Sequence, residues 1–180
     1  ERLGYPGLKI SLPVETVTDT IYFKWYADYI LAIEAVARRR GAPTTCPLAI
    51  MTSCDTHART VELLENNNFF GLLSSQITLM QQGKVPCLID SNAALSIDSS
   101  KVIECKPHGH GDVHSLLLQH GLPAKWVSKG KKWLLFFQDT NALAFRIICA
   151  ALGVSKREKW AMNSIAVDRV PKEATGGLCR

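Results

Sequence analysis

The sequence predicts an α/β fold in which a mostly parallel sheet is flanked by helices. Short apolar runs of strand length alternate with helical segments along the chain. Polar turns follow the predicted strands that end at Met51, Phe137 and Val167. Because such sheets bind ligands at the carboxyl ends of their strands, we expect these turns to line one functional edge.

The first half of the chain predicts a loop followed by alternating helices and strands. Residues 1–13 hold glycines and prolines around Lys9, which indicates a loop. Aromatic and apolar residues at helical spacing predict a helix from Ile21 to Arg40, with Thr20 as its N-cap. The other elements expected here are a strand at Pro47–Met51, a turn at Thr52–Thr56, a helix capped by Ser53 or Asp55 that runs to Glu65, and strands at Ile77–Met80 and Val85–Ile89.

The second half predicts three helices and two strands after the polar stretch Asp90–Ser100. The run Lys132–Phe137 has the strongest strand signal in the chain, because its apolar character is almost unbroken. The remaining elements are a loop at 106–111, helices at Asp112–His120, Ala124–Lys129 and Leu143–Leu152, the last closed by Gly153, a strand at Ala161–Val167, and a loop at Pro171–Gly177.

The composition is that of a globular chain. Hydrophobic residues make up 47% and charged residues 21%, which excludes disorder as the main state. No apolar run approaches the ~18–20 residues that span a bilayer, and no secretory signal opens the chain, so we expect no membrane partner. The six cysteines form no CxxC pair, which gives a zinc site little support and favours reduced thiols in the cytoplasm.

The net charge of +5 and the chain ends carry further information. Arg38–Arg40 and Lys129–Lys132 are the basic clusters. Nucleic-acid binders carry such patches, but solvated helix ends explain both more simply, so we expect no nucleic-acid partner. A positive excess also suits polyphosphate substrates. The chain begins at Glu1 and stops at Arg180 without terminal motifs, so we interpret it as part of one longer domain.

The densest functional signal is the segment from His108 to Asp112. Its two glycines would let backbone amides approach a ligand, Asp112 could cap the following helix, and His110 could donate to a phosphate or a sugar hydroxyl. A glycine-rich turn with surface histidines is the plainer alternative. A metal site from His108, His110 and His114 is a second alternative, but no acidic or thiolate partner has a matching spacing.

Three further residues have both a functional and a plainer interpretation. Asp139 follows the apolar run and could hold magnesium beside substrate phosphates, although an ordinary helix N-cap explains the segment more simply. Lys9 could meet a triphosphate as a point charge, whereas a solitary exposed lysine is commoner. Cys54 could be a nucleophile, but the sequence identifies no positioned base, which favours a bystander thiol.

Taken together, these segments resemble UDP-sugar pyrophosphorylases, the broad-specificity uridylyltransferases of plants and protists. The matching segments appear in the family's order: ERLGYPGLKISLP at 1–13, MTSCDTH at 51–57, KPHGHGDVHSLL at 106–117, FFQDTN at 136–141 and VPKEATGGLCR at 170–180. The resemblance implies a Rossmann-like, GT-A-like nucleotidyltransferase domain. Residues 1–180 would be part of that single catalytic domain, without the start of its glycine-rich loop and without a second catalytic lysine beyond Arg180. Cys54 stands where the family usually carries Asp.

The resemblance also implies a role for each matching position. Lys9, His110 and Asp139 would be catalytic, with Lys9 on the UTP phosphates, His110 at the phosphate or sugar, and Asp139 on Mg²⁺ or Mn²⁺. The implied substrate-binding residues are Met51 and Thr52 beside the uridine, Gln82 and Gly109 at the uracil, Asn141 near the sugar, and Asn163, Glu173 and Gly176 in the sugar pocket.

The implied reaction joins UTP and a sugar 1-phosphate, such as that of glucose or galactose, into a UDP-sugar with release of pyrophosphate. A sugar-phosphate oxygen would attack the α-phosphorus in line, with no covalent enzyme intermediate. We expect a monomer. The alternatives are a UDP-glucose or UDP-N-acetylhexosamine pyrophosphorylase of narrower specificity, which the QDTN and KPHGHGDVH forms disfavour, and a non-catalytic nucleotide-sugar binding module.

Overall fold

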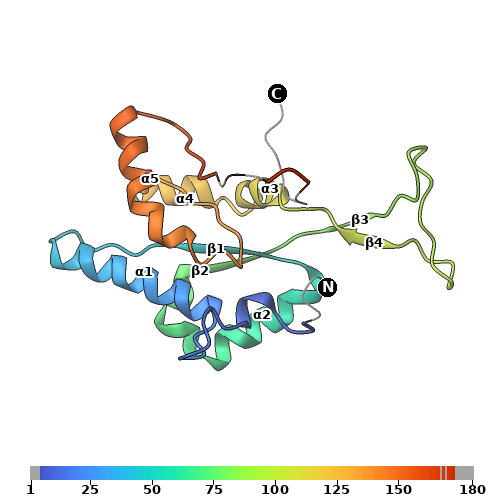
Figure 1. The fold of residues 1–180 in the computed structure, drawn as a ribbon, viewed down its shortest axis with the longest axis horizontal. Helices are drawn as coiled ribbons and strands as arrows, with labels where there is room; N and C mark the ends of the chain where they lie inside the picture. Colours follow the sequence, from blue (N-terminus) through green and yellow to red (C-terminus); the bar gives the residue numbers. More distant parts are fainter. Residues whose placement is uncertain (1–4, 167, 169, 173–180) are drawn as a thin grey trace. The chain divides into compact units, whose positions relative to one another are not determined.

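The computed structural model describes residues 5–166, 168 and 170–172. The chain divides into two compact units, Glu1–Ala142 and Leu143–Arg180. The first unit contains the sheet and all but one of the helices described below, and Figure 1 shows the course of the chain through them. The expectation of a single domain stays a prediction.

A pair of parallel strands forms the centre of the first unit. Strand β1 (Leu48–Thr52) pairs with β2 (Ile77–Gln81), in register from Leu48↔Ile77 to Thr52↔Gln81. Helix α2 (Cys54–Asn66) lies in the connection between them, as a parallel crossover requires. Both strands therefore end at the same edge, at Thr52 and Gln81, which confirms two predicted strands and their parallel arrangement.

Apolar clusters cover both faces of this strand pair, because alternate residues of β1 pack against different clusters. Leu48 and Ile50 pack against one cluster and Ala49 and Met51 against the other. The first cluster joins α1 (Tyr22–Arg39) and α2 to the N-terminal loop through Leu8, Ile10, Phe23, Ala27, Ile30, Leu64 and Leu72. The second joins Met80 to α3 (Asp112–Gln119) and α4 (Leu122–Ser128) through Leu116, Leu117, Leu122 and Trp126. Helices thus cover the pair on both sides (Figure 1).

The boundaries of helices α1 to α4 lie within two residues of the predictions, and the caps follow the predictions in part. Ser53 is the N-cap of α2 and forms a capping box with Thr56. This confirms Ser53, one of the two residues predicted as the cap. The prediction that Thr20 caps α1 is wrong, because the N-cap is Ile21 and the Thr20 hydroxyl lies 2.6 Å from the Thr18 hydroxyl instead.

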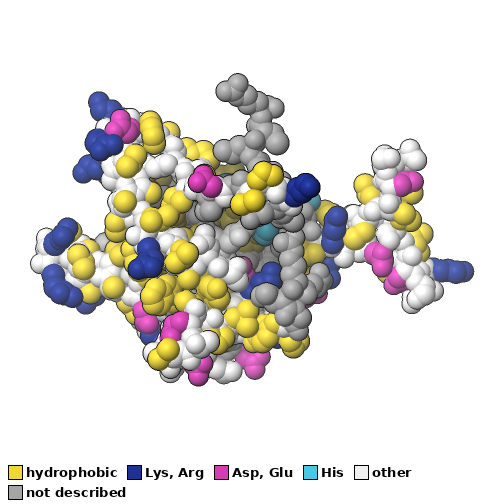
Figure 2. All heavy atoms as spheres, viewed as in Figure 1, with side chains coloured by type: hydrophobic (Ala, Val, Ile, Leu, Met, Phe, Trp, Pro, Cys, Tyr) yellow, Lys and Arg dark blue, Asp and Glu magenta, His cyan; other side chains and the backbone are white. Residues whose placement is uncertain are grey.

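An antiparallel ribbon extends from the sheet edge. Strand β3 (Lys84–Pro86) pairs with β4 (Cys105–Pro107), and isolated bridges join Leu88 to Leu95 and Ile97 to Ile103. The predicted strand Val85–Ile89 is therefore shorter and starts earlier. Residues 87–104 form an arm whose apolar side chains are largely exposed, as the hydrophobic atoms on its surface show in Figure 2.

The predicted strands at Lys132–Phe137 and Ala161–Val167 are wrong over the described residues. Neither 132–137 nor 161–166 has regular structure. The apolar run 132–137 is held by ring contacts instead, with Phe137 5.1 Å from Tyr26 and Phe136 4.9 Å from His114, measured between ring centroids. Apolar composition predicts that a segment packs, whereas a strand also needs a neighbouring backbone to complete its hydrogen bonds.

The second unit contains α5 (Ala144–Glu158). The prediction that Gly153 closes this helix is wrong, because the helix continues until Lys159, which has a φ of 58°. One interior glycine costs about 1 kcal/mol relative to alanine, which a helix of this length tolerates. No helix in the described part of the chain is both long and apolar enough to cross a membrane.

Replacing Met80 by alanine is expected to destabilise the first unit by about 2–5 kcal/mol, the usual cost of truncating a buried methionine or leucine. Met80 has an exposed fraction of 0% and packs in the second cluster. Denaturant unfolding, followed by fluorescence, measures the loss. The matched control is Met162→Ala, because Met162 is 82% exposed. Equal shifts for the two variants would contradict this packing.

Candidate functional site

Segments that are far apart in sequence meet at the carboxyl ends of β1 and β2, with Gln82 at their junction. The Gln82 backbone N–H donates to the Thr52 carbonyl at 2.8 Å, which carries the pairing one residue past β2. The Gly109 backbone N–H donates to the Gln82 side-chain oxygen at 3.4 Å. The structure therefore brings together Thr52, Gln82 and Gly109, which the family resemblance assigns to uridine binding.

Met51 and Thr52 support this edge from inside. Met51 is half-buried against the second cluster, and Thr52 is only 4% exposed. The Thr52 hydroxyl lies 2.8 Å from His57 Nδ1 and 3.4 Å from the Met80 carbonyl. Sequence reasoning assigned no role to His57, although it closes the MTSCDTH segment one helical turn after Ser53.

The loop before α3 is closed by an interaction between His108 and Asp112. His108 Nδ1 lies 2.6 Å from the Asp112 carboxylate. The prediction that Asp112 caps the helix is therefore wrong: the N-cap is Gly111 and no side chain bonds there. Gly109 has a φ of 138°, a backbone conformation that residues with a side chain rarely adopt. The loop therefore requires glycine at this position. His110 is exposed on the loop that these contacts hold.

The metal interpretation of the three histidines gains no support. Among the residues that the structure describes, no group of three or more His, Cys, Asp or Glu side chains could hold a metal ion. His108 bonds to Asp112, and the His114 ring packs 4.9 Å from the Phe136 ring. His108 and His114 therefore make separate contacts and do not share one site with each other.

The turn that carries Asp139 is anchored on α1. The Tyr26 hydroxyl donates to the Asp139 backbone carbonyl at 3.1 Å, and the Tyr26 ring packs edge-on against Phe137. Burial raises the pKa of Tyr26 far above its usual value, and Tyr22 and Asp139 add to the shift, so the phenol stays neutral and can donate. Asp139 and Asn141 are exposed. The helix-cap interpretation is wrong, because the N-cap of α5 is Leu143 without a side-chain cap bond.

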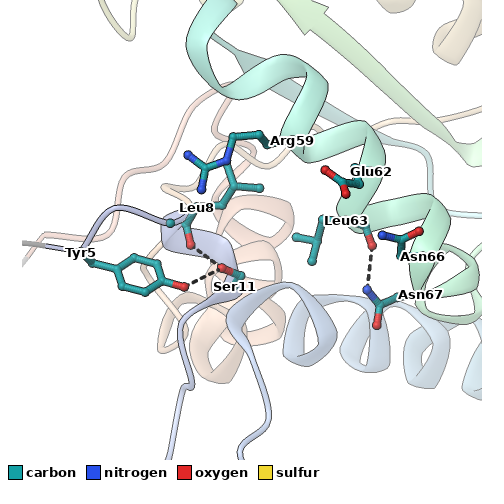
Figure 3. A pocket seen from close by; sticks show the side chains of 9 residues that line it. Tyr5, Leu8, Ser11, Arg59, Glu62, Leu63, Asn66 and Asn67 are labelled. Atoms are coloured by element: carbon teal, nitrogen blue, oxygen red, sulfur yellow. Dashed lines mark hydrogen bonds between the residues drawn. The ribbon is translucent and has the colours of Figure 1, made fainter.

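The N-terminal loop presents Lys9 between two buried residues, Leu8 and Ile10. Arg59 of α2 donates to the Pro6 carbonyl at 3.0 Å, and the Ser11 hydroxyl donates to the Leu8 carbonyl at 2.7 Å. A pocket of about 250 Å³ lies between this loop and α2 (Figure 3). Lys9 does not line the pocket and is exposed, and no hydrogen bond among the described residues joins it to Gln82 or Asp139.

A small polar cluster at the start of α2 was not expected from the sequence. The Asp55 carboxylate accepts from Lys84 Nζ at 3.4 Å and from the Cys54 thiol at 3.2 Å. The Cys54 hydrogen bond and then Lys84 lower the pKa of Asp55. The cluster adds a cation, Lys84, beside the end of β2. Among the described contacts, the Cys54 thiol donates a hydrogen bond to a carboxylate and none to a histidine, which favours the bystander interpretation.

The remaining residues predicted for the sugar pocket are Asn163, Glu173 and Gly176. Asn163 lies in the second unit, where its side-chain amide donates to the Ala151 carbonyl at 3.2 Å. Glu173 and Gly176 lie outside the described residues. The predicted roles of all three residues remain predictions.

Comparison with known proteins places these features in a family. Residues 26–179 match the family model of UTP–glucose-1-phosphate uridylyltransferase. The chain is 49% identical to a UDP-sugar pyrophosphorylase of Arabidopsis thaliana and 48% identical to one of Oryza sativa subsp. indica, in each case over 100% of this chain and 30% of the relative. The chain therefore spans about a third of the length of these curated relatives.

A solved structure has a similar fold. The uridine diphosphate N-acetylglucosamine pyrophosphorylase from Trypanosoma brucei, in complex with an inhibitor, superimposes with a TM-score of 0.58 at 25% identity. The match covers 64% of this chain and 23% of that chain. It agrees with the α/β arrangement of strands and helices described above.

Proposed function

Because the chain belongs to the UTP–glucose-1-phosphate uridylyltransferase family, we propose that the full-length protein transfers the uridylyl group of UTP to sugar 1-phosphates. The products are a UDP-sugar and pyrophosphate, and the reaction is reversible. The observation that carries the proposal is the meeting of Thr52, Gln82 and Gly109 at one sheet edge, in a chain 49% identical throughout to a UDP-sugar pyrophosphorylase. The domain to which the chain belongs is Rossmann-like, of the GT-A type.

The uridine lies against Gln82 and Gly109 in this proposal. The Gln82 side-chain oxygen already accepts from the Gly109 N–H, so its amide NH₂ is the group that donates to a uracil carbonyl. Gly109 has no side chain, and nothing lies within 4 Å of where a Cβ would be. A planar base can therefore approach its backbone closely.

The phosphates lie toward the start of α3 and the exposed cations. The N-terminus of a helix favours anions, because its free N–H groups and the helix dipole point there. His110 lies in the loop just before this helix, and Lys9 and Lys84 are exposed cations of the same unit. These residues bind the triphosphate, orient it, and offset the charge that spreads over its oxygens during transfer.

The divalent cation is held by Asp139. One exposed carboxylate fits the way in which Mg²⁺ binds beside nucleotides, with one or two protein carboxylates and otherwise phosphate oxygens and water. The bound ion supplies neutralisation of phosphate charge. Tyr26 donates to the backbone carbonyl of Asp139, so the carboxylate stands on a turn that is anchored to α1. Asn141, Asn163, Glu173 and Gly176 belong to the sugar site.

A panel of sugar 1-phosphates tests this proposal with the full-length protein. Pyrophosphate release is measured with UTP, Mg²⁺ and the 1-phosphates of glucose, galactose and N-acetylglucosamine, with ATP and CTP as nucleotide controls. We expect activity with UTP and with several sugars. Activity with one sugar alone would contradict broad specificity, and no activity with any sugar would contradict the enzymatic function.

A further inference from the structure

A second cavity lies at the amino ends of β1 and β2, at the opposite end of the strands from Gln82 and Gly109. It has a volume of about 490 Å³. Pro47 directly precedes β1, and Gln76 and Thr78 lie at the start of β2. The described residues that line it are Arg38, Pro43, Thr44, Thr45, Pro47, Leu73, Ser75, Gln76, Thr78, Lys125, Trp126, Lys129 and Lys131.

Among the residues that the structure describes, four cations and no carboxylate line this cavity. Arg38 comes from the end of α1, Lys125 from α4, and Lys129 and Lys131 from the segment that follows α4. The fold therefore brings the two basic clusters of the sequence, near 38–40 and 129–132, to one place. Figure 2 shows Lys and Arg side chains gathered over the C-terminal end of α1.

A buried carboxylate close to the cavity lining, Glu34, is already satisfied by other groups. Glu34 is 8% exposed, and its carboxylate accepts from Gln76 Nε2 at 2.7 Å and from the Cys46 N–H at 2.6 Å. Burial and then Glu34 raise the pKa of the Cys46 thiol, whereas Lys131 lowers it, so these three groups lie close enough to interact. Glu34 does not line the cavity, so the cations of the cavity walls outnumber this carboxylate.

The cavity is partly preorganised for an anion. Lys131 Nζ donates to the Thr44 hydroxyl at 2.6 Å and to the Thr45 carbonyl at 2.5 Å, which fixes its position across 86 residues of sequence. Hydroxyl groups of Thr44, Ser75 and Thr78 add neutral donors, and Trp126 adds an aromatic wall. Sites that bind phosphate typically contain several lysine and arginine side chains.

We propose that this cavity binds a phosphate-bearing small molecule at a site separate from the uridine edge. Its volume lies in the range of small-molecule sites, roughly 300–1,000 Å³. A concave cavity that combines an aromatic wall with converging cations suits a compact polyanion better than a nucleic acid, whose backbone needs an extended basic track. The proposal does not depend on the uridylyltransferase function.

Binding of pyrophosphate to the full-length protein, measured by calorimetry without Mg²⁺, tests the proposal. The variant Lys125→Gln with Lys129→Gln removes two exposed lining cations, and Lys101→Gln with Lys132→Gln removes the same charge from exposed residues outside the lining. We expect the wild type and the control variant to bind pyrophosphate with similar affinity. The cavity variant should bind it at least ~10-fold more weakly, the scale of losing charge-assisted hydrogen bonds. The kcat and the KM for UTP should not change.

Three outcomes would overturn the proposal. The first is unchanged pyrophosphate binding in the cavity variant. The second is an equal loss in both variants, which would indicate a general charge effect. The third is binding of a single-stranded DNA oligonucleotide that is tighter than pyrophosphate binding and is lost in the same variant. Thermal unfolding of both variants, followed by circular dichroism, verifies that the fold persists.

Discussion

Replacing Asp139 by alanine is expected to lower kcat for pyrophosphate release by at least ~100-fold, the scale of losing one preorganised charge-stabilising group. The proposed role of the carboxylate is to hold the divalent cation beside the substrate phosphates. The change should leave the turn in place, because the Tyr26 hydroxyl donates to the backbone carbonyl of Asp139, which the substitution retains. Steady-state rates over a range of Mg²⁺ concentrations measure the effect.

The matched control for this variant is Asp28→Ala. Asp28 is exposed on α1 and forms an ion pair with Lys24 one turn away, an exposed contact that contributes little free energy. We expect the control to retain the wild-type kcat. If Asp139→Ala also retained it at the same Mg²⁺ concentration, Asp139 would have no part in metal binding or in the reaction.

The variant His110→Ala is expected to lose a similar factor in kcat, at least ~100-fold, because the imidazole would no longer stabilise charge on the phosphate. His110 is exposed, and the shape of its loop depends on other contacts, between Gly109 and Gln82 and between His108 and Asp112. The melting temperature should therefore stay near that of the wild type while the rate falls.

His120→Ala is the control for this second variant. His120 is exposed and follows the last turn of α3, at the end of the helix remote from His110. A rate loss in His110→Ala without a stability loss supports a role at the substrate. A near-normal kcat in His110→Ala would remove this residue from the mechanism, and an equal loss in His120→Ala would indicate a structural effect.

The sequence predicted the helices and the central strands well, because their amphipathic pattern is set locally. The apolar side chains of α1 recur at helical spacing, and β1 alternates residues between two buried clusters. The failure at 132–137 has a different origin. Its hydrophobic side chains predict packing, and Phe136 and Phe137 do pack on other rings. A strand, however, forms only where a neighbouring backbone is available to pair with it, and the local sequence does not show whether one is.

The candidate site was predictable as a set of segments but not as a set of contacts. Resemblance to a family selected Gln82 and Gly109, and the structure adds that they bond to each other. The interaction of His108 with Asp112 displaced a helix-capping role that the sequence pattern favoured. The contact of Lys84 with Asp55 could not be predicted, because 29 residues separate the partners and no pattern in the sequence pairs them.

The uridylyl transfer itself is tested most directly with UTP that carries ³²P at the α-phosphorus. The full-length protein is incubated with this UTP, Mg²⁺ and glucose 1-phosphate, and the products are separated by chromatography. We expect the label in UDP-glucose, in an amount equal to the pyrophosphate released, and none bound to the protein after denaturation. Label that stays in UTP, appears in UMP, or remains covalently attached to the protein would contradict direct transfer to the sugar 1-phosphate.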